Sequence, residues 1–480
     1  MKVEHLIEPE LEFGGGGRHI DIRFGLMNYG PLDLESTSRP TSVPVGVVGS
    51  SESVDGLHRW LERCRNEIPA KESRQPNLFP HFPGFSSDSP LRCGIAADRE
   101  LDRTLGGKLI KELAKKSSAN SVIETAVDAF VGEIAAIAEK GRAKVIFVAL
   151  PLEVLEAVDR AAAQPLRGKT RRRTPRFDLH DLLKARAMTH HVPIQLVRPA
   201  TYDPSKKQRP KAPADRPRPL QDEATRAWNL HTAFYYKAGG RPWRLERLSS
   251  DLTTCYVGVS FYRTLDEKRL ETSIAQVFNE RGEGVIVRGA QAMLAKDDLQ
   301  PHLSETDACA LLEQALGRYR TEHKTLPARV VLHKSSNYSV GERAGFEQAL
   351  EAVGIESADL LTLMRSSARL LRRGSYPPLR GTWFELDARR QLLYTRGSVP
   401  FYATYPGLYI PQPLEIRVEA HEHAPRLLAQ EVLALTKLNW NDSQFDVAVP
   451  ITRGAAMNVG AILKYVQQDG PVEPRYSFYM

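Results

Sequence analysis

Short runs of β-branched residues alternate with amphipathic helical patterns, and this alternation allows few folds. Residues 43–48 form such a run, which a Gly-Ser-Ser turn joins to a helical pattern over 53–65. A second run, 144–150, follows a helical stripe over 121–140 and precedes a helical pattern that ends at 163. Strands that alternate with helices form a mostly parallel sheet covered by helices. We therefore predict a Rossmann-like α/β domain in the first half of the chain.

The pattern restarts after about residue 246. We expect a strand, a pair of strands, a helix, a further strand and a further helix, over residues 253–262, 272–279 with 284–288, 305–319, 329–333 and 342–353. Antiparallel strands followed by a helix and another strand are the order of a ribonuclease-H-like sheet. The predicted fold class is α/β, with one domain over 1–245 and a second over 246–480.

Composition indicates an ordinary globular chain. The 480 residues are 42% hydrophobic and 26% charged, which leaves room for two or three domains. The longest apolar run is far shorter than the roughly 20 residues of a membrane span, and no basic-then-apolar leader opens the chain. The four cysteines lie far apart and form no Cys-x-x-Cys pair, so we expect neither a disulfide framework nor a zinc finger, and a cytoplasmic protein.

The basic excess is concentrated in two segments. Residues 164–176 carry six Lys or Arg and no acid, and residues 204–219 carry six and one Asp. They contribute +6 and +5, or +11 together, so the rest of a chain of net charge +8 carries −3. This distribution suits a polyanionic ligand. Two solvated, mobile loops are the alternative, and the five prolines of 204–219 exclude regular structure there.

Four polar residues suggest a terminal-phosphate pocket. His180 and Lys184 share a face of a predicted helix, because they are four residues apart. Gln195 follows in an apolar strand, and Lys237 precedes Ala-Gly-Gly. Two lysines neutralise a phosphate, a glutamine donates to it or ligates a cation, and an aromatic ring stacks on the end base. Taken alone, a His/Lys pair on a helix is usually surface decoration.

This spacing resembles the 5′-phosphate pocket of the Argonaute MID domain. Residues 13–33 resemble the start of the short prokaryotic Argonautes, and residues 395–414 and 435–445 resemble their PIWI domain. The chain has no room for the N-terminal and PAZ domains of a long Argonaute. The resemblance implies that Lys184, Gln195 and Lys237 hold a guide 5′ phosphate, with His180 in the aromatic position.

The same resemblance implies a divalent cation, such as Mg²⁺, at the guide phosphate. Gln195 and the carboxylate of Met480 would ligate it. Simple docking of the apolar segment 476–480 into a core is the alternative for Met480.

The carboxylates of a cutting PIWI domain are missing. Where a Gly-x-Asp is usual, the sequence reads Gly-Val-Ser at 258–260, and Lys334 stands where an Arg-Asp is usual. The last ligand falls near Met457 by looser alignment. Serine ligates metal poorly and a lysine ammonium repels it, so we expect an inactive nuclease site at Ser260, Lys334 and Met457. Lys334 either contacts the target backbone or pairs with a neighbouring carboxylate.

Several other residues suggest nucleic-acid contact. Lys437, Asn439 and Asn441 combine a cation with amides around a tryptophan, and the resemblance supports a role for them at the guide or target backbone. A basic helical face that tracks nucleic acid, or is merely solvated, is expected from Arg365, Arg369, Arg372 and Arg373. The pair His421 and His423 has the spacing of some metal sites, but no third ligand is near in sequence, which favours surface histidines.

The resemblance implies a guided sensor rather than an enzyme. A small RNA guide would direct the chain to single-stranded DNA, and a partner with an APAZ region and a Sir2 or TIR effector would deplete NAD to abort plasmid or phage invasion. No NAD site is expected in this chain. The alternatives are a guided nuclease with unconventional ligands, a partner of a nuclease-type effector, and a plain single-strand binder that ignores the guide 5′ phosphate.

Overall fold

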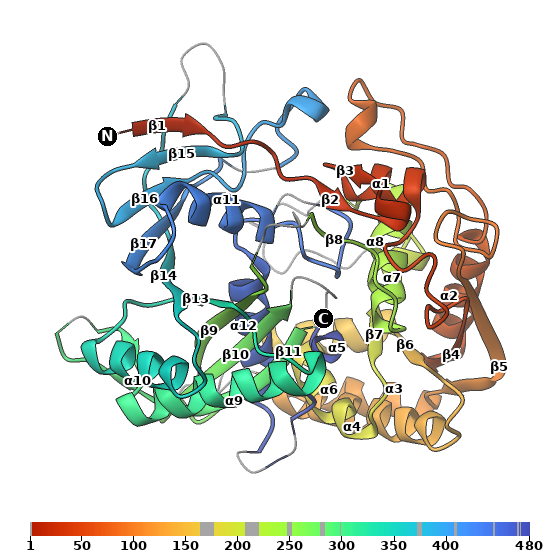
Figure 1. Ribbon diagram of the computed structural model, residues 1–480. Helices are drawn as coiled ribbons and strands as arrows, with labels where there is room; N and C mark the ends of the chain where they lie inside the picture. The colour runs from red at the N-terminus through yellow and green to blue at the C-terminus, as the bar shows by residue number, and fades with distance from the viewer. Residues whose placement is uncertain are drawn as a thin grey trace.

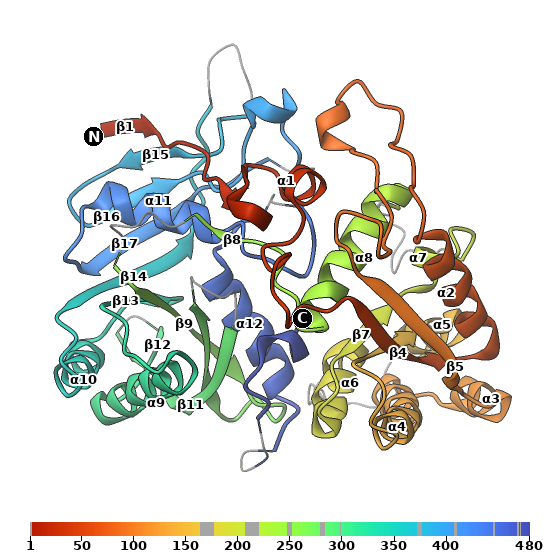
Figure 2. The same ribbon diagram turned by 45° about the vertical axis from the view of Figure 1, so that its right-hand side comes forward.

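A computed structural model describes residues 2–163, 177–206, 220–246, 252–278, 284–297, 299–371, 377–407, 410–444, 447–467, 470 and 472–480. The basic segment 164–176 lies outside these residues, and only 204–206 of the second basic segment lie within them. Two α/β lobes stand side by side (Figures 1 and 2). No helix in the described ranges is long and apolar enough to cross a membrane.

The first lobe is built on a four-stranded parallel sheet in the order β5-β4-β6-β7. The strands are β4 (Ser42–Gly49), β5 (Gly94–Thr104), β6 (Val145–Ala149) and β7 (Ile194–Val197). Every residue of β6 is buried, and its side chains alternate between the two faces. This parallel sheet confirms the predicted Rossmann-like α/β arrangement.

Helices cover both faces of that sheet. One face packs against α4 (Ala119–Ala138), α5 (Leu152–Ala163) and α6 (Leu179–Ala187). The other packs against α2 (Ser51–Arg63) and α8 (Glu223–Lys237). The short helices α3 (Gly107–Lys115), α1 (Ile22–Tyr29) and α7 (Pro199–Tyr202) complete the lobe. The helices α6 and α8 thus approach β7 from opposite faces of the sheet.

The second lobe contains a ten-stranded mixed sheet in the order β1-β15-β16-β17-β14-β13-β9-β10-β11-β12. Its strands in this lobe are β9 (Thr254–Arg263), β10 (Leu270–Phe278), β11 (Gly284–Leu294), β12 (Pro301–His302), β13 (Arg329–Lys334), β14 (Ser357–Arg365), β15 (Thr382–Glu385), β16 (Arg390–Leu393) and β17 (Leu414–Ala420). The strands β9, β10 and β11 are antiparallel neighbours, and β13 runs parallel to β9 and β14. This order confirms the ribonuclease-H-like prediction.

Four helices cover the large sheet. On one face lie α9 (Glu305–His323) and α10 (Val340–Glu351), and on the other lie α11 (Pro425–Leu435) and α12 (Ile451–Leu463). A Cβ at Gly258 of β9 would lie 2.1 Å from the carbonyl oxygen of Thr452, so only glycine lets α12 approach this closely.

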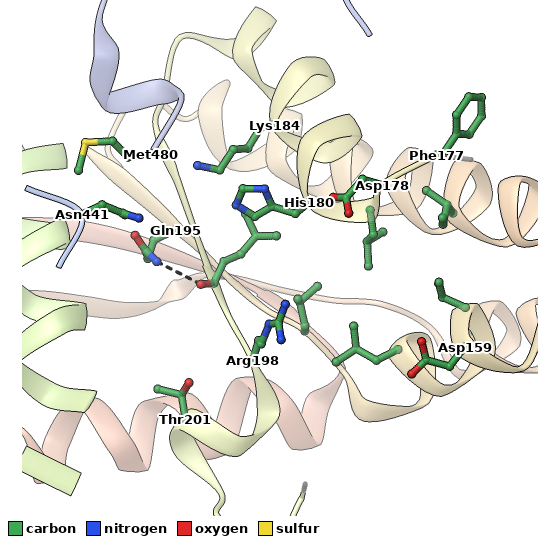
Figure 3. A pocket seen from close by; sticks show the side chains of 16 residues that line it. Asp159, Phe177, Asp178, His180, Lys184, Gln195, Arg198, Thr201, Asn441 and Met480 are labelled. Carbon is green, nitrogen blue, oxygen red and sulfur yellow. Dashed lines mark hydrogen bonds between the residues drawn. The ribbon is translucent and has the colours of Figure 1, made fainter. Parts of the chain in front are cut away.

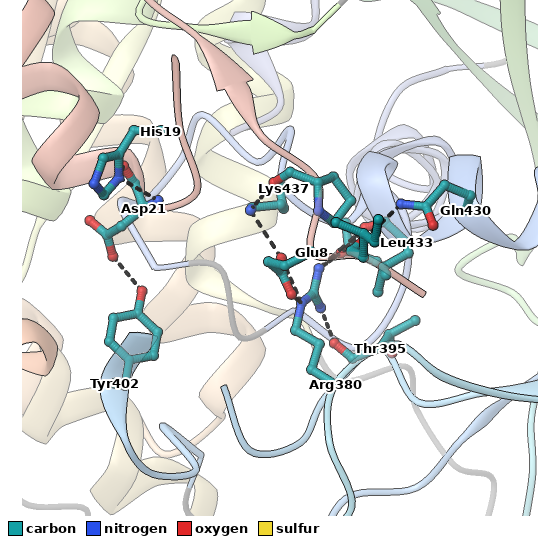
Figure 4. A network of polar contacts seen from close by, with 12 residues as sticks. Glu8, His19, Asp21, Arg380, Thr395, Tyr402, Gln430, Leu433 and Lys437 are labelled. Atoms are coloured by element: carbon teal, nitrogen blue, oxygen red, sulfur yellow. Dashed lines mark hydrogen bonds and ion pairs between the residues drawn. The ribbon is translucent and has the colours of Figure 1, made fainter. Parts of the chain in front are cut away.

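The N-terminal segment joins the two lobes. Strand β1 (Lys2–His5) pairs with β15 at the edge of the large sheet, although the sequence reading groups residues 1–245 together. Next, β2 (Leu11–Glu12) pairs with β3 (Arg18–His19) and with β8 (Arg244–Leu245). Two buried polar contacts fix the segment: Glu8 pairs with Arg380, and the Tyr402 hydroxyl donates to Asp21 (Figure 4).

The predicted basic helical face around Arg365 is wrong. Arg365 ends strand β14, and Arg369 follows in a segment without helix. Arg372 and Arg373 lie outside the described residues. Tertiary strand pairing with β17 has overridden the helical pattern.

Candidate phosphate-binding site

Elements of the first lobe, the chain after α11 of the second lobe and the C-terminal residue form one pocket of about 680 Å³ (Figure 3). Helix α6 supplies His180 and Lys184, strand β7 supplies Gln195, and the chain after α11 supplies Asn441. Met480 closes one side. The structure therefore brings together residues that are about 300 positions apart in sequence.

Helix α6 holds His180 and Lys184 in fixed positions because its N-terminus is capped. The Asp178 carboxylate caps the helix by accepting from the Asp181 amide at 3.1 Å. His180 and Lys184 are then one turn apart on the same face, as predicted. Figure 3 shows both side chains directed into the pocket.

Lys184 is a buried cation without a partner. Its side chain is only 2% exposed, and its Nζ atom has no hydrogen-bond acceptor in the described structure. Burial lowers the pKa of Lys184 to about 7, and nearby Asp181 opposes this shift. A charged Lys184 in this position destabilises the folded protein, because the charge is buried without a partner. An anionic ligand would offset this destabilisation.

Lys237 lies at the last position of α8 and is also buried. Its Nζ donates to Gln195 Oε1 at 2.8 Å, to Ile194 O at 2.9 Å and to the main-chain oxygen of Met480 at 3.1 Å. Burial first, and the neighbouring Lys184 charge second, lower the pKa of Lys237 well below its ordinary value. Lys237 is not among the residues that line the pocket, but it contacts two that are, Gln195 and Met480, and its charge interacts with that of Lys184. This basic neighbourhood favours an anionic ligand.

His180 lies at the mouth of the pocket. Its side chain is half exposed, and its Nδ1 lies 2.9 Å from Asp181 Oδ1. With Asp178 these residues form the one group in the described ranges whose carboxylate and imidazole atoms are close enough for a shared metal ion. The group is exposed, and such acidic groups are common without a metal.

Further pocket residues were missed by the sequence analysis. Arg198 follows the last residue of β7, and Phe177 and Asp159 line the far end. The position of Arg198 offered a usable signal, because ligands bind beyond the carboxyl ends of parallel strands. Asp159 and Phe177 flank the segment 164–176, and no motif marks them.

The predicted nucleic-acid residues after α11 separate in the structure. Asn441 is exposed and lines the pocket, whereas Asn439 donates from Nδ2 to Asp442 Oδ2 at 2.9 Å. Lys437 is fully buried, and its Nζ lies 3.0 Å from Glu8 Oε1 and donates to the Pro9 carbonyl (Figure 4). Burial in this ion pair places Lys437 away from any nucleic-acid surface, so its position does not support the expected backbone contact.

The degenerate nuclease positions come together on adjacent strands. Ser260 lies on β9 and Lys334 ends β13, where it pairs in register with Val259. Met457 lies on α12 and is 45% exposed. Helix α12 packs across β9 and β10, since the Ser273 hydroxyl donates to the Ala456 carbonyl at 2.8 Å.

Two roles were expected for Lys334, contact with the target backbone or an ion pair with a neighbouring carboxylate. The structure shows the ion pair. Its Nζ lies 2.7 Å from Glu342 Oε2 and donates to the Asn337 carbonyl at 2.7 Å. Both Lys334 and Glu342 are fully buried, and Glu342 also accepts from the amides of Leu303 and Ser339. The ammonium is therefore not available to a nucleic-acid backbone, which corrects that expectation.

The two histidines at 421 and 423 are accounted for without a metal. His423 Nδ1 lies 3.0 Å from Asp359 Oδ2, and His421 Nδ1 lies 2.9 Å from the His423 carbonyl. Asp359 in turn pairs with Arg329 in the core. His421, His423, Asp359 and Arg329 thus form a network of polar contacts that stabilises the fold.

The parallel lobe and the ribonuclease-H-like lobe together match the MID–PIWI architecture of solved Argonaute structures. The chain is similar to the Clostridium butyricum Argonaute solved with a guide DNA (5′ deoxycytidine) and a 19-mer target DNA, at 14% identity, with a TM-score of 0.66. Aa-Ago with externally bound siRNA and A. aeolicus Argonaute match at 15% and 14% identity, both with a TM-score of 0.58.

Each match covers 98% of this chain and 54% of the other, so the chain spans about half the length of these structures. No family model and no curated protein matches the sequence. At these identities the likeness establishes an Argonaute-like fold.

Proposed function

We propose that this chain binds the 5′-phosphorylated end of a small RNA guide in the pocket of the first lobe and pairs that guide with single-stranded DNA. The observation that carries the proposal is the unpartnered, buried ammonium of Lys184 beside Lys237. A terminal phosphate supplies two negative charges near neutral pH and would give Lys184 the partner that it lacks, while the charge of Lys237 nearby would add to the attraction. The C. butyricum structure holds a guide DNA and a target DNA, which supports the coarser part of the proposal, guided binding of nucleic acid.

The pocket chemistry also suits a divalent cation at the guide phosphate. Gln195 Oε1 and the main-chain oxygen of Met480 already converge on one cationic group, Lys237 Nζ. Oxygen ligands are those that Mg²⁺ prefers. These two residues would hold the ion, and the ion would neutralise part of the phosphate charge. The role of the Met480 carboxylate stays a prediction.

We propose further that the chain does not cut its target. Lys334 supports this view, since a buried ammonium paired with Glu342 would repel a metal ion from the ends of β9 and β13. Ser260 offers a poor metal ligand on the neighbouring strand. Sequence would then be read by guide–target pairing, while the protein holds the backbone and the guide end.

If the chain only binds its target, another protein must carry out the response to that binding. We assign this response to a partner protein. The resemblance to short Argonautes supports an APAZ-containing partner with a Sir2 or TIR effector that hydrolyses NAD when target is bound. Depletion of NAD would abort plasmid or phage invasion.

The complete proposal is tested by purifying the chain with such a partner and following target cleavage and NAD loss together. NAD loss that needs both guide and target, with the target intact, supports the proposal. Cleavage by this chain alone would refute the inactive site. Loss of NAD that is equal with 5′-hydroxyl and 5′-phosphate guides would refute phosphate recognition and favour a plain single-strand binder. Guided binding with neither event would point to another kind of effector, such as a nuclease.

A further inference from the structure

The ten-stranded sheet has two edges, and they differ in how well they are protected. At one edge, β12 is two residues long and begins with Pro301, which cannot donate a hydrogen bond to an added strand. At the other edge, β1 pairs with β15 in an unbroken register and contains no proline. Both ribbon views show β1 at the upper left, on the outer side of the sheet (Figures 1 and 2), and no strand among the described residues lies beyond it. A regular edge strand of this kind is a template for a further strand.

The pairing with β15 determines which backbone groups of β1 remain available. In an antiparallel ladder, the N–H and C=O groups of successive residues are directed alternately to the two sides of the strand. The Leu6 amide donates to the Gly381 carbonyl, just before β15, at 2.9 Å. The even-numbered residues of β1 are therefore directed to β15 as well. Val3 and His5 direct their N–H and C=O groups away from the sheet, where a further strand would bind.

The side chains at this edge offer two opposite charges and apolar surface. Lys2 and Glu4 share the face of β1 that is turned towards α11, since Glu4 Oε2 lies 2.8 Å from Arg426 Nε. Val3 is directed to the opposite face and is 53% exposed. Leu427 follows Arg426 on α11 and is 44% exposed. An incoming strand would therefore meet one cation and one anion two residues apart, together with apolar side chains that it would remove from water.

We infer that β1 pairs with β1 of a second copy of this chain, in an antiparallel, two-fold symmetric ladder centred on Val3. In this register the two Val3 residues exchange the backbone hydrogen bonds that each directs outward. Lys2 of each copy then lies directly opposite Glu4 of the other, so that both cross-strand pairs join opposite charges. The strand is complementary in charge to itself, and this selects a second copy as the occupant of the edge.

The two neighbouring registers are less favourable. A ladder centred on Glu4 would place this carboxylate opposite its own copy, and like charges directly opposite each other destabilise a strand pair. A ladder centred on His5 would extend to Ile7, whose carbonyl already accepts from Gln430 Nε2 at 2.8 Å. Because the ladder centred on Val3 is short, the dimer should be weak, with a dissociation constant on the order of 10 μM.

The first test is the mass of the purified full chain, with its affinity tag removed, at concentrations from about 1 to 200 μM. Sedimentation velocity should give a mass close to the 53.7 kDa of one chain at the lowest concentration and close to twice that mass at the highest. Val3→Pro removes an outward-directed N–H and keeps the ladder with β15, so this variant should stay monomeric throughout, with an unchanged melting temperature. A wild-type chain that stays monomeric at the highest concentration would overturn the inference and leave the edge to a strand of another protein.

An exchange of charges tests the register. Lys2→Glu and Glu4→Lys each place like charges opposite one another in a homodimer, so each variant alone should be monomeric. An equimolar mixture of the two should dimerise again, because every cross-strand pair then joins opposite charges. The matched control is Glu356→Lys, which changes an exposed acid before β14 and should dimerise as the wild type does.

The outcomes decide the inference without reference to guide binding. Dimers that return in the mixture would support the register centred on Val3. Charge variants that dimerise alone, or a mixture that stays monomeric, would refute it, and a Val3→Pro chain that dimerises as the wild type does would place the contact elsewhere. If Val3→Pro lowers the melting temperature, the charge variants decide, since they leave the backbone unchanged. Strand β1 lies away from the C-terminus, whose residue Met480 lines the pocket (Figures 1 and 2), so Val3→Pro should bind 5′-phosphorylated RNA with wild-type affinity.

Discussion

Replacing Lys184 by methionine should stabilise the free protein and weaken guide binding at the same time. Methionine keeps the length of the side chain and removes the buried charge. A pKa lowered from 10.5 to about 7 corresponds to about 5 kcal/mol of destabilisation of the charged form. Because that charge has no partner in the free protein, Lys184→Met should raise the free energy of unfolding by up to about 5 kcal/mol at pH 6.

The pH dependence fixes the sign of this effect. The folded-state pKa of Lys184 is below the unfolded value, so the folded state bears the full cost below about pH 7. The cost declines as pH rises from about 7 towards 10.5, since the unfolded chain then binds more protons than the folded one. The advantage of Lys184→Met over the wild type should therefore be largest at pH 6 and should shrink by pH 9.

Guide affinity should change in the opposite direction. A bound phosphate needs the charged lysine, so wild-type affinity should fall above pH 7 by up to tenfold per pH unit, because binding then takes up a proton. The variant should bind about 10- to 100-fold more weakly at pH 6.5, as expected for a lost charge-assisted contact, and should keep only the pH dependence that comes from Lys237. Denaturant unfolding and titration of labelled RNA measure the two effects.

The matched control is Lys111→Met, which removes an exposed lysine of α3 and should leave both profiles unchanged. A variant that unfolds more easily than the wild type at pH 6 would show that Lys184 is paired in solution. Unchanged binding of phosphorylated RNA would remove Lys184 from the site.

Three further outcomes are expected. Lys334→Ala should lower the free energy of unfolding by about 3–5 kcal/mol, because it removes the buried ammonium that balances the Glu342 carboxylate and leaves that carboxylate only the amides of Leu303 and Ser339 and the His302 imidazole. The double variant with Glu342→Gln should recover part of that loss in denaturant unfolding, and a stable single variant would contradict the buried pair. Lys437→Met should destabilise the fold by leaving Glu8 with one fewer partner, yet leave the affinity for phosphorylated RNA unchanged in a filter-binding assay; a loss of affinity would restore the role in backbone contact. Removing divalent cations with EDTA should weaken binding of phosphorylated guide severalfold, and Gln195→Ala should abolish the difference; equal affinity with and without EDTA would mean that Lys237 alone serves this position.

Sequence patterns predicted the central strands of the two sheets because these strands are continuously apolar. The run over β6 is buried on both faces, and no competing pattern existed there. The pocket residues on α6 and β7 were also found from the sequence, since their spacing is local and matches a known motif. The prediction worked where short-range periodicity decides the structure.

Long-range pairing explains what the sequence did not reveal. The partner of Lys437 is Glu8, near the other end of the chain, so nothing around Lys437 indicates that its charge is buried. Strand β1 covers only four residues and joins the large sheet through β15. Arg365 was expected on a helix, but pairing with β17 made its segment a strand. In each case the deciding contact joins segments far apart in sequence.

The most direct test of the central claim is the affinity of the purified chain for one RNA sequence prepared with a 5′ phosphate and with a 5′ hydroxyl. The account predicts that the phosphate strengthens binding at least about tenfold at pH 6.5, and that Lys184→Met removes most of this difference. Equal affinity for the two RNAs, or a phosphate effect that survives in Lys184→Met, would contradict the assignment of the pocket.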